Sequence, residues 1–277
     1  MNPSFTLLTA ALLCLLGFGV GVFGTLVGAG GGFIVTPALL LVYPRSTPAL
    51  ITAISLIVVF FNAASGSSAY ARQRRIDYRS GVLFALCTLP GSILGVVVAD
   101  HVSRPGFDVV MGVALTALAV WLLQGREEPA GEGVGAGVAR RIVGRDGREY
   151  RYRANVRLGA ALSVCVGFIS SFLGIGGGVV HVPLLVAVLG FPTHVATATS
   201  HFVLAIMALV ATATHVVAGT FHHGAGLRRA AALSVGVVVG AQLGAVLSQR
   251  LSGRLIQRLL AAGLLALGAR LILSVVV

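Results

Sequence analysis

The chain has 277 residues, of which 57% are hydrophobic and only 10% are charged, and its formal net charge at pH 7 is +12. A soluble domain of this size carries about 25% charged residues and 45–50% apolar ones. The composition therefore excludes an ordinary soluble enzyme, a disordered chain and a small disulfide-linked scaffold, and it indicates a protein that crosses a membrane several times. All 20 basic residues are arginine and lie in short segments between apolar runs, which is the positive-inside pattern rather than a nucleic-acid-binding surface.

Apolar runs bounded by charged or turn-forming residues predict eight membrane units. In chain order they are Phe5–Val42, Pro48–Tyr70, Ser80–Ala99, Phe107–Leu123, Leu158–Leu189, His194–Gly219, Leu233–Leu247 and Leu255–Val277. Most match the roughly 17–25 residues that a transmembrane helix needs. The first and fifth are too long for one span and too short for two full spans with a turn. We therefore expect an all-α polytopic membrane protein with about eight transmembrane helices.

Arginine-rich loops set the expected orientation. Residues 71–79 hold four arginines, and residues 126–157 hold eight arginines with five acidic residues. Both segments are short enough to obey the positive-inside bias, so both are predicted to face the cytoplasm. The longer one is interpreted as a linker, with an amphipathic piece around Arg140–Val143. The expected organisation is a first transmembrane repeat over residues 1–124, a cytoplasmic arginine-rich linker over 125–156 and a second repeat over 157–277.

The two halves repeat each other in sequence. The segment from Val27 to Gly32 (VGAGGG) matches that from Leu173 to Gly178 (LGIGGG) at an offset of 146, and a proline follows each at the same distance. The next spans also align, with Leu50–Ser55 against Val195–Ser200. This matching spacing indicates an internal duplication, which is common in transporters. The loop charges leave open whether the repeats are inverted or parallel.

The glycine runs are the most informative motif. Each glycine inside a helix costs roughly 1 kcal/mol relative to alanine, so the clusters predict a helix, a short extended piece and a second short helix. Freed backbone groups in a membrane survive only inside the protein or against a water-filled cavity. Their N–H groups, with the following helix N-terminus, suit an anion. The predicted substrate-binding glycines are Gly28, Gly30, Gly31, Gly32, Gly174, Gly176, Gly177 and Gly178. The alternative is that glycine only allows close helix packing, as expected for Gly17, Gly21, Gly91, Gly95, Gly236, Gly240 and Gly244.

Polar side chains near these breaks form a second layer of candidates. The expected substrate-binding residues are Thr36, Ser55, Asn62, His181, Thr197, Ser200 and His201. Histidine can change charge near neutral pH, which makes His181, His201 and His215 candidates for proton coupling. The alternative is that these rings and hydroxyls only satisfy backbone carbonyls. No carboxylate lies in the middle of an apolar run, which argues against a cation pathway.

At these residues the sequence resembles the TauE/SafE family of sulfite and organosulfonate permeases. The resemblance rests on the duplicated Gly-x-Gly-Gly-Gly-x4-Pro segment, on Thr197–Ser200, and on Asn62–Gly66 leading to an arginine-rich loop. It implies a multi-pass protein of the bacterial inner (plasma) membrane that moves small sulfur-containing anions such as sulfite or organosulfonates. Export and proton coupling are expected, together with a lipid-bilayer setting, a small anionic substrate and a homodimer. The second half departs from the first in placing Met207 where the first has Asn62.

Other functions fit parts of the sequence. An anion channel and a membrane assembly protein stay as alternatives, although an assembly role does not explain the duplicated breaks. An intramembrane hydrolase would use Ser65 or Ser67 with His201 or His215, but no carboxylate is available to orient the histidine. The isolated Cys14, Cys87 and Cys165 predict neither a disulfide framework nor a metal site. We therefore expect no catalytic residue, no cofactor, no metal and no nucleic-acid partner.

Overall fold

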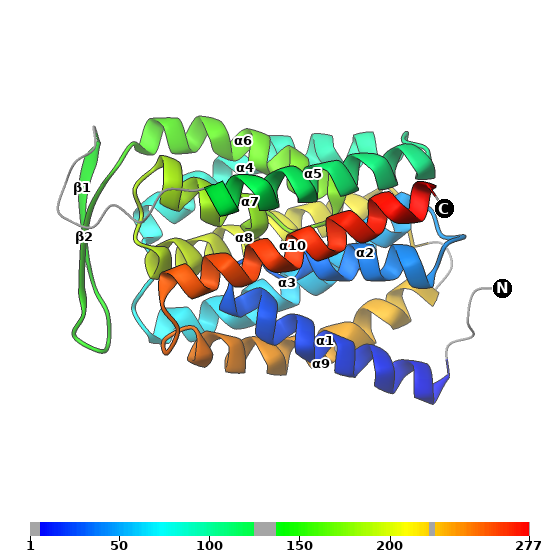
Figure 1. Ribbon diagram of the computed structural model, residues 1–277, viewed down its shortest axis with the longest axis horizontal. Coiled ribbons are helices and arrows are strands. Elements are labelled where there is room, and N and C mark those ends of the chain that lie inside the picture. The colour runs from blue at the N-terminus through cyan, green and yellow to red at the C-terminus, as the bar shows by residue number, and fades with distance from the viewer. Residues whose placement is uncertain (1–5, 125–136, 222–224, 277) are drawn as a thin grey trace.

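The computed structural model describes residues 6–124, 137–221 and 225–276, and it is predominantly helical. Long helices run along one axis of the molecule, and a β-hairpin stands at one end of them (Figure 1). Seven helices in the described part of the chain are long and apolar enough to cross a membrane. The expected all-α polytopic membrane fold is confirmed.

The first part of the chain forms five helices: α1 (Leu7–Leu26), α2 (Gly32–Val42), α3 (Pro48–Arg72), α4 (Tyr78–Ala99) and α5 (Arg104–Gln124). Local signals fix their starts. The Thr47 side chain accepts a hydrogen bond from the Leu50 N–H, and Pro48 occupies the first turn of α3, where its missing N–H costs nothing. The Asp77 carboxylate caps α4 in the same way through the Ser80 N–H.

A β-hairpin follows, made of β1 (Val138–Val143) and β2 (Glu149–Ala154) in antiparallel register, with Val138 opposite Ala154. The amphipathic piece expected around Arg140–Val143 is therefore a strand. Alternating apolar and charged residues suit a half-exposed strand, and the turn uses Gly147 at φ 77°. Residues 125–136 of the predicted linker lie outside the described part of the chain.

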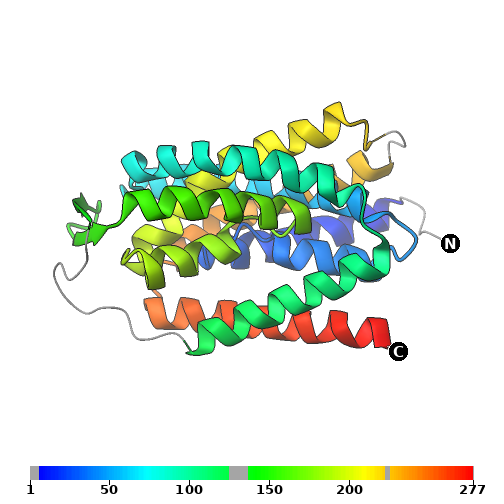
Figure 2. The same ribbon diagram turned by 90° about the horizontal axis from the view of Figure 1, so that it is seen from above.

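The second part forms α6 (Val156–Leu173), α7 (Gly178–Pro183), a short π-helical segment η1 (Leu184–Val188), α8 (Thr193–Val217), α9 (Ala225–Leu247) and α10 (Gly253–Val276). The eighth predicted unit corresponds to α10, which lies beside α5 on one side of the bundle (Figure 2). The order of elements around the two glycine runs is therefore the same in both parts of the chain.

Equivalent helices of the two parts run in opposite directions. In Figure 1, α1 begins at the end away from the hairpin, whereas α6 begins at the hairpin. The helix pairs are also related by interchanging the two parts of the chain. Helix α1 lies along α9 as α6 lies along α4, while α3 faces its equivalent α8 and α5 faces its equivalent α10. The helix arrangement is thus that of an inverted repeat, which resolves the alternative left open by the loop charges. The division at residues 124 and 157 stays a prediction.

Glycine ladders join the crossed pairs. A Cβ on Gly21 would come within 2.5 Å of the Val237 carbonyl oxygen, and one on Gly95 within 2.8 Å of the Phe172 nitrogen. The other ladder glycines, Gly17, Gly91, Gly236, Gly240 and Gly244, also face the backbone of the partner helix. Helices α1 with α9 and α4 with α6 therefore pack backbone to backbone, as expected for these seven glycines.

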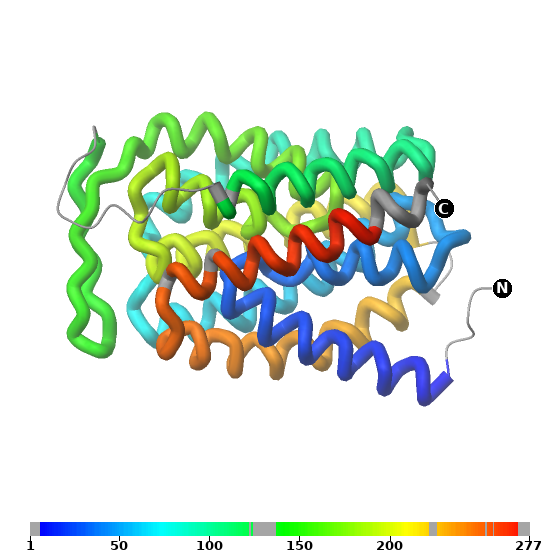
Figure 3. Tube along the Cα trace, viewed as in Figure 1, coloured from blue at the N-terminus to red at the C-terminus, as the bar shows by residue number. Residues whose placement is uncertain are grey.

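Each glycine run reverses the chain instead of continuing the span. After α1 the chain turns, and α2 runs back toward the end where α1 began (Figure 3). The Tyr43 ring after α2 lies 3.8 Å from the Arg229 guanidinium near the start of α9 at that end. In the second part, Phe191 after η1 packs on Tyr152 of the hairpin, with ring centroids 4.6 Å apart. Each over-long apolar unit is thus one full-length helix followed by a half-length returning helix.

Candidate functional site

The two glycine breaks lie directly against each other. A Cβ on Gly32 would lie within 2.5 Å of the Ile175 carbonyl, and a Cβ on Gly178 would lie 2.7 Å from the Ala29 Cα. The contact is reciprocal, because each returning helix begins on the break of the other half. Only residues without side chains allow the two backbones to approach this closely.

The first break is a compact turn rather than the expected short extended piece. Its left-handed residues are Gly28, Gly30 and Gly31, at φ 78°, 75° and 80°. The reason is a local hydrogen-bond pattern, in which the Ala29 and Gly30 N–H groups both donate to the Gly24 carbonyl, at 2.8 and 3.2 Å. The second break has left-handed Gly174 and Gly176 in the same places, at φ 64° and 74°. L-residues with a side chain rarely adopt this conformation.

Predicted hydroxyl residues surround the crossing and bond to its carbonyls. The Gly174 carbonyl accepts hydrogen bonds from Thr36 Oγ1 at 2.7 Å and from Ser55 Oγ at 2.6 Å. Ser200 Oγ donates to the Gly28 carbonyl at 3.4 Å. The backbone of Thr197 lies against Gly28, while its own hydroxyl donates to the Thr193 carbonyl at 2.8 Å. The structure therefore brings these residues to the breaks, but in this conformation their hydroxyls hold the backbone together.

Asn62 and Met207 occupy equivalent places beside the two breaks. Asn62 Nδ2 is fully buried, lies 3.4 Å from the Cβ position of Gly31 and has no hydrogen-bond partner among the described residues. Met207 Cε lies 3.4 Å from the Cβ position of Gly177. Because asparagine occupies this position in the first half and methionine occupies it in the second, the first break has a free amide donor beside it and the second has an apolar side chain.

A buried polar cluster forms around Asn62 and consists of Thr25, Asn62, Tyr70 and His201, and we call it the Asn62 cluster. Thr25 Oγ1 donates to Asn62 Oδ1 at 2.7 Å and lies 3.3 Å from His201 Nε2. The Tyr70 hydroxyl donates to the Thr25 carbonyl at 2.7 Å, and the Tyr70 and His201 rings meet edge to face at 5.6 Å. All four side chains are at most 1% exposed.

Two members of this cluster were not predicted from the sequence. Thr25 was missed because a single threonine in an apolar run usually bonds only to its own helix. The repeat itself holds a signal, since the offset of 146 pairs Gly24 and Thr25 with Ser170 and Ser171. Ser170 Oγ lies 3.3 Å from the Cβ position of Gly177 and has no partner in the described part. Tyr70 had no such signal, because its role depends on which helix faces it.

The other two candidate histidines lie apart from this cluster. The buried His181 ring packs edge-on against Phe84 of α4, with centroids 5.8 Å apart, and its Nε2 has no partner in the described residues. His215 is near the end of α8 away from the hairpin, where its Nδ1 lies 3.2 Å from Thr220 Oγ1. Only His201 therefore shares hydrogen-bonded neighbours with Asn62.

The described residues contain no group of three or more histidine, cysteine, aspartate or glutamate side chains that would hold a metal ion. Ser65 Oγ donates to the Val238 carbonyl at 2.8 Å, and Ser67 Oγ has no hydrogen-bond partner in the parts described. Neither serine is bonded to a histidine, as the hydrolase alternative would need.

Comparison with known proteins agrees with a multi-pass membrane fold. The profile of the family described as "Sulfite exporter TauE/SafE" matches residues 13–271. The chain is 30% identical over 215 residues to the "Probable membrane transporter protein YunE" of Bacillus subtilis, covering 75% of this chain and 78% of the relative. It is 27% identical over 220 residues to a "Probable membrane transporter protein" of Methanocaldococcus jannaschii, covering 77% and 75%. No solved structure matches the chain. The profile covers almost the whole chain, and the chain therefore belongs to the sulfite exporter TauE/SafE family of multi-pass membrane transporters.

Proposed function

We propose that this protein is a secondary carrier that exports small sulfur-containing anions, such as sulfite or organosulfonates, across the plasma (inner) membrane. The observation that supports it best is the free Nδ2 of Asn62 beside the first glycine break. An amide N–H in a buried site gains most from an acceptor that carries negative charge. A sulfite or sulfonate group offers three such oxygens.

The start of α2 adds further donors to the same place. The Gly31 carbonyl accepts from the Ile34 and Val35 N–H groups, and Gly31 provides no side-chain cap, so the Gly32 and Phe33 N–H groups at the start of α2 have no intrahelical acceptor. The helix dipole adds a partial positive charge there. Carboxylates of the described spans lie at their ends, as with Asp77 at the start of α4 and Asp108 in the first turns of α5. The first break would thus attract an anion without a charged side chain.

Close packing at the crossing favours a carrier over a channel. Val27, Ala29 and Val179, which lie in or next to the breaks, are fully buried. A continuous pore cannot pass through such a contact, whereas a carrier opens it to one side at a time. Inverted repeats whose broken helices meet midway are the arrangement that alternating access uses in other transporters. Helices α2 and α7 would separate to expose the Asn62 amide.

Transport in proteoliposomes tests the proposal. Purified protein would be reconstituted, and sulfite, thiosulfate, taurine and sulfoacetate would be compared as substrates with and without a pH gradient. We expect Asn62→Leu, which keeps the branched shape of the side chain and removes the donor, to reduce transport at least tenfold, because a charge-assisted hydrogen bond contributes about 1.5–3 kcal/mol. Met207→Leu at the equivalent place in the second break is the matched control and should stay near the wild-type rate.

Two outcomes would contradict this assignment. Absence of transport of all four anions by the wild type would remove the carrier proposal for this class of substrate. Equal losses in Asn62→Leu and Met207→Leu would remove the special role of the first break.

Proton coupling is assigned first to His201, which shares Thr25 with Asn62. His201→Gln should abolish the stimulation of transport by a pH gradient, while His181→Gln and His215→Gln should retain it.

A further inference from the structure

A polar pocket of about 450 Å³ opens at the hairpin end of the bundle, away from the glycine crossing. Its wall combines the end of α3, the turn of the hairpin and the last turns of α9. Its charged residues are Arg72, Arg75, Arg145 and Asp146, and the amides of Gln73, Gln242 and Gln249 complete its polar lining. The lining thus includes three arginines and one aspartate, which leaves it with an excess of positive charge.

Arg75 is the central cation of this pocket. It is only 2% exposed, and its Nη2 lies 3.4 Å from Asp146 Oδ2. Its Nη1 is buried and has no hydrogen-bond partner among the described residues. A buried guanidinium with one unpaired donor is costly, because the desolvation of that donor is not compensated. The arrangement is therefore incomplete, and a second acceptor at this position would complete it.

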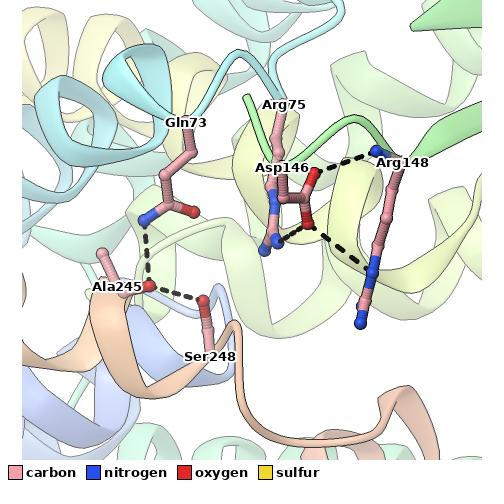
Figure 4. Close-up of polar contacts among 6 residues, drawn as sticks. All are labelled: Gln73, Arg75, Asp146, Arg148, Ala245 and Ser248. Atoms are coloured by element: carbon pink, nitrogen blue, oxygen red, sulfur yellow. Dashed lines mark hydrogen bonds and ion pairs between the residues drawn. The ribbon is translucent and has the colours of Figure 1, made fainter. Parts of the chain in front are cut away.

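The Asp146 carboxylate reaches the pocket from the turn of the hairpin. It lies between Arg75 and Arg148, whose Nε is 3.6 Å away, and its Oδ1 also accepts a hydrogen bond from the Arg148 N–H at 3.2 Å (Figure 4). The side chain of Asp146 is 38% exposed, against 3% for that of Arg75. The carboxylate is thus the accessible and replaceable partner in this pair, while the guanidinium is fixed.

The floor of the pocket leads toward the Asn62 cluster along α3. Gln242 Nε2 donates to Ser65 Oγ at 2.8 Å, one helical turn from Asn62. Gln73 Nε2 donates to the Ala245 carbonyl at 3.0 Å, which ties the end of α3 to α9. Ala69 lines the pocket, and the next residue, Tyr70, belongs to the Asn62 cluster. Polar groups on one side of α3 therefore connect the pocket with the first break.

We propose that this pocket is a binding site for a small oxyanion at the hairpin end. In the absence of the anion, the Asp146 carboxylate occupies the acceptor position on Arg75. The bound oxyanion would take the Asp146 position on Arg75 and also accept from Nη1. The chemical class is a sulfonate or sulfite group, whose several oxygens satisfy both nitrogens in the bidentate way that guanidinium favours. The further idea that an anion binds at this site before it reaches the Asn62 cluster rests on the proposed transport function.

Direct binding and transport test this site separately. Methanesulfonate binding to the purified full-length protein would be measured by titration calorimetry, and sulfite transport would be measured in proteoliposomes. Asp146→Asn removes the competing carboxylate, so we expect the Kd of methanesulfonate to fall about two- to fivefold. Arg75→Gln should raise that Kd at least tenfold. Glu149→Gln is the matched control, because Glu149 pairs with Arg141 and Arg151 on the same hairpin and does not line the pocket.

The outcomes distinguish this proposal from the proposed function. If the wild type transports sulfite but Asp146→Asn and Glu149→Gln have the same Kd for methanesulfonate, the pocket proposal is wrong and the carrier assignment stands. If methanesulfonate binds and responds to Asp146→Asn while no anion is transported, the site stands and the carrier assignment fails. The tighter methanesulfonate binding expected for Asp146→Asn cannot arise from misfolding. The proposal therefore stays testable even if Arg75→Gln loses binding only because it is unstable.

Discussion

Gly178 shows how one residue controls the contact between the two halves. A side chain at this position would meet the backbone of Gly28 and Ala29, which is a rigid neighbour. We predict that Gly178→Ala destabilises the protein by about 1–3 kcal/mol through overpacking and sharply reduces transport. Gly19→Ala in α1 is the matched control, because a Cβ there meets nothing within 4 Å. Thermal unfolding in detergent would measure both variants.

The two substitutions should differ clearly in their effect on stability. Gly19→Ala removes a flexible residue from a helix and should be neutral or stabilising by up to about 1 kcal/mol. A Gly178→Ala variant that is as stable and as active as wild type would show that the breaks need not touch during transport.

The Asp146 carboxyl gives a prediction about pH. Partial desolvation raises its pKa, but the hydrogen bond from the Arg148 N–H and the charge of Arg75 outweigh this and hold the pKa below its ordinary value of 3.8. The pair therefore contributes its stability above pH 3.8 and loses it as the pH falls through the lowered pKa. Carbon-13 NMR of the labelled carboxyl should give a midpoint below 3.8 in wild type and a higher one in Arg75→Gln. An unchanged midpoint in the variant would contradict the assigned cause.

At the scale of elements, the hairpin is fixed to the bundle through Asp77. This buried carboxylate caps α4, accepts a hydrogen bond from Ser80 Oγ at 2.7 Å and accepts another from the Tyr152 hydroxyl at 2.8 Å. The Arg140 guanidinium of β1 lies 3.5 Å from it. Burial and the nearby Asp77 charge raise the pKa of Tyr152 well above its ordinary value, so this phenol stays a donor at neutral pH.

Removing that phenol should loosen the hairpin. We predict that Tyr152→Phe costs about 1–3 kcal/mol, because a buried carboxylate loses a donor, and that amide hydrogens of β1 and β2 exchange faster. Tyr150→Phe on the same strand is the control, because the Tyr150 hydroxyl is buried without a hydrogen-bond partner in the described residues. That variant should exchange at the wild-type rate or more slowly. Equal exchange in both variants would show that Asp77 does not hold the hairpin.

Glycine spacing and apolar length were enough to predict the spans and the two breaks, because both follow from local chemistry. The alignment of the following spans, at an offset of 145, also placed Asn62 opposite Met207, and the structure puts both beside a break. The Asn62 cluster was only half predictable, since Thr25 and Tyr70 become partners through the packing of α1 against α3. The hairpin was missed because two six-residue strands give a weak pattern inside a charged segment. Contacts between distant segments are the part that local sequence signals do not encode.

At the scale of the whole molecule, the two ends differ strongly in charge. The hairpin end collects residues 72–79 between α3 and α4, residues 137–157 of the hairpin and the start of α6, and residues 250–254 before and at the start of α10, and these segments hold 13 of the 20 arginines. At the other end, Arg45 lies in a short loop, Arg229 near the start of α9 packs on Tyr43, and Arg104 donates to the Leu40 carbonyl in the last turn of α2 at 2.7 Å. From the positive-inside bias we propose that the hairpin faces the cytoplasm, so that the pocket around Arg75 would open on the cytoplasmic side of the proposed carrier.

Cysteine labelling from one side of the membrane tests this orientation. In a variant whose three native cysteines are replaced, Arg141→Cys on the hairpin and Arg45→Cys at the opposite end both put a thiol on an exposed position. With a membrane-impermeant maleimide added to right-side-out vesicles, we expect Arg45→Cys to be labelled at once and Arg141→Cys only after permeabilisation. The opposite pattern would place the pocket around Arg75 outside the cell. That pocket would then receive anions on import, and the exporter assignment would have to be reversed.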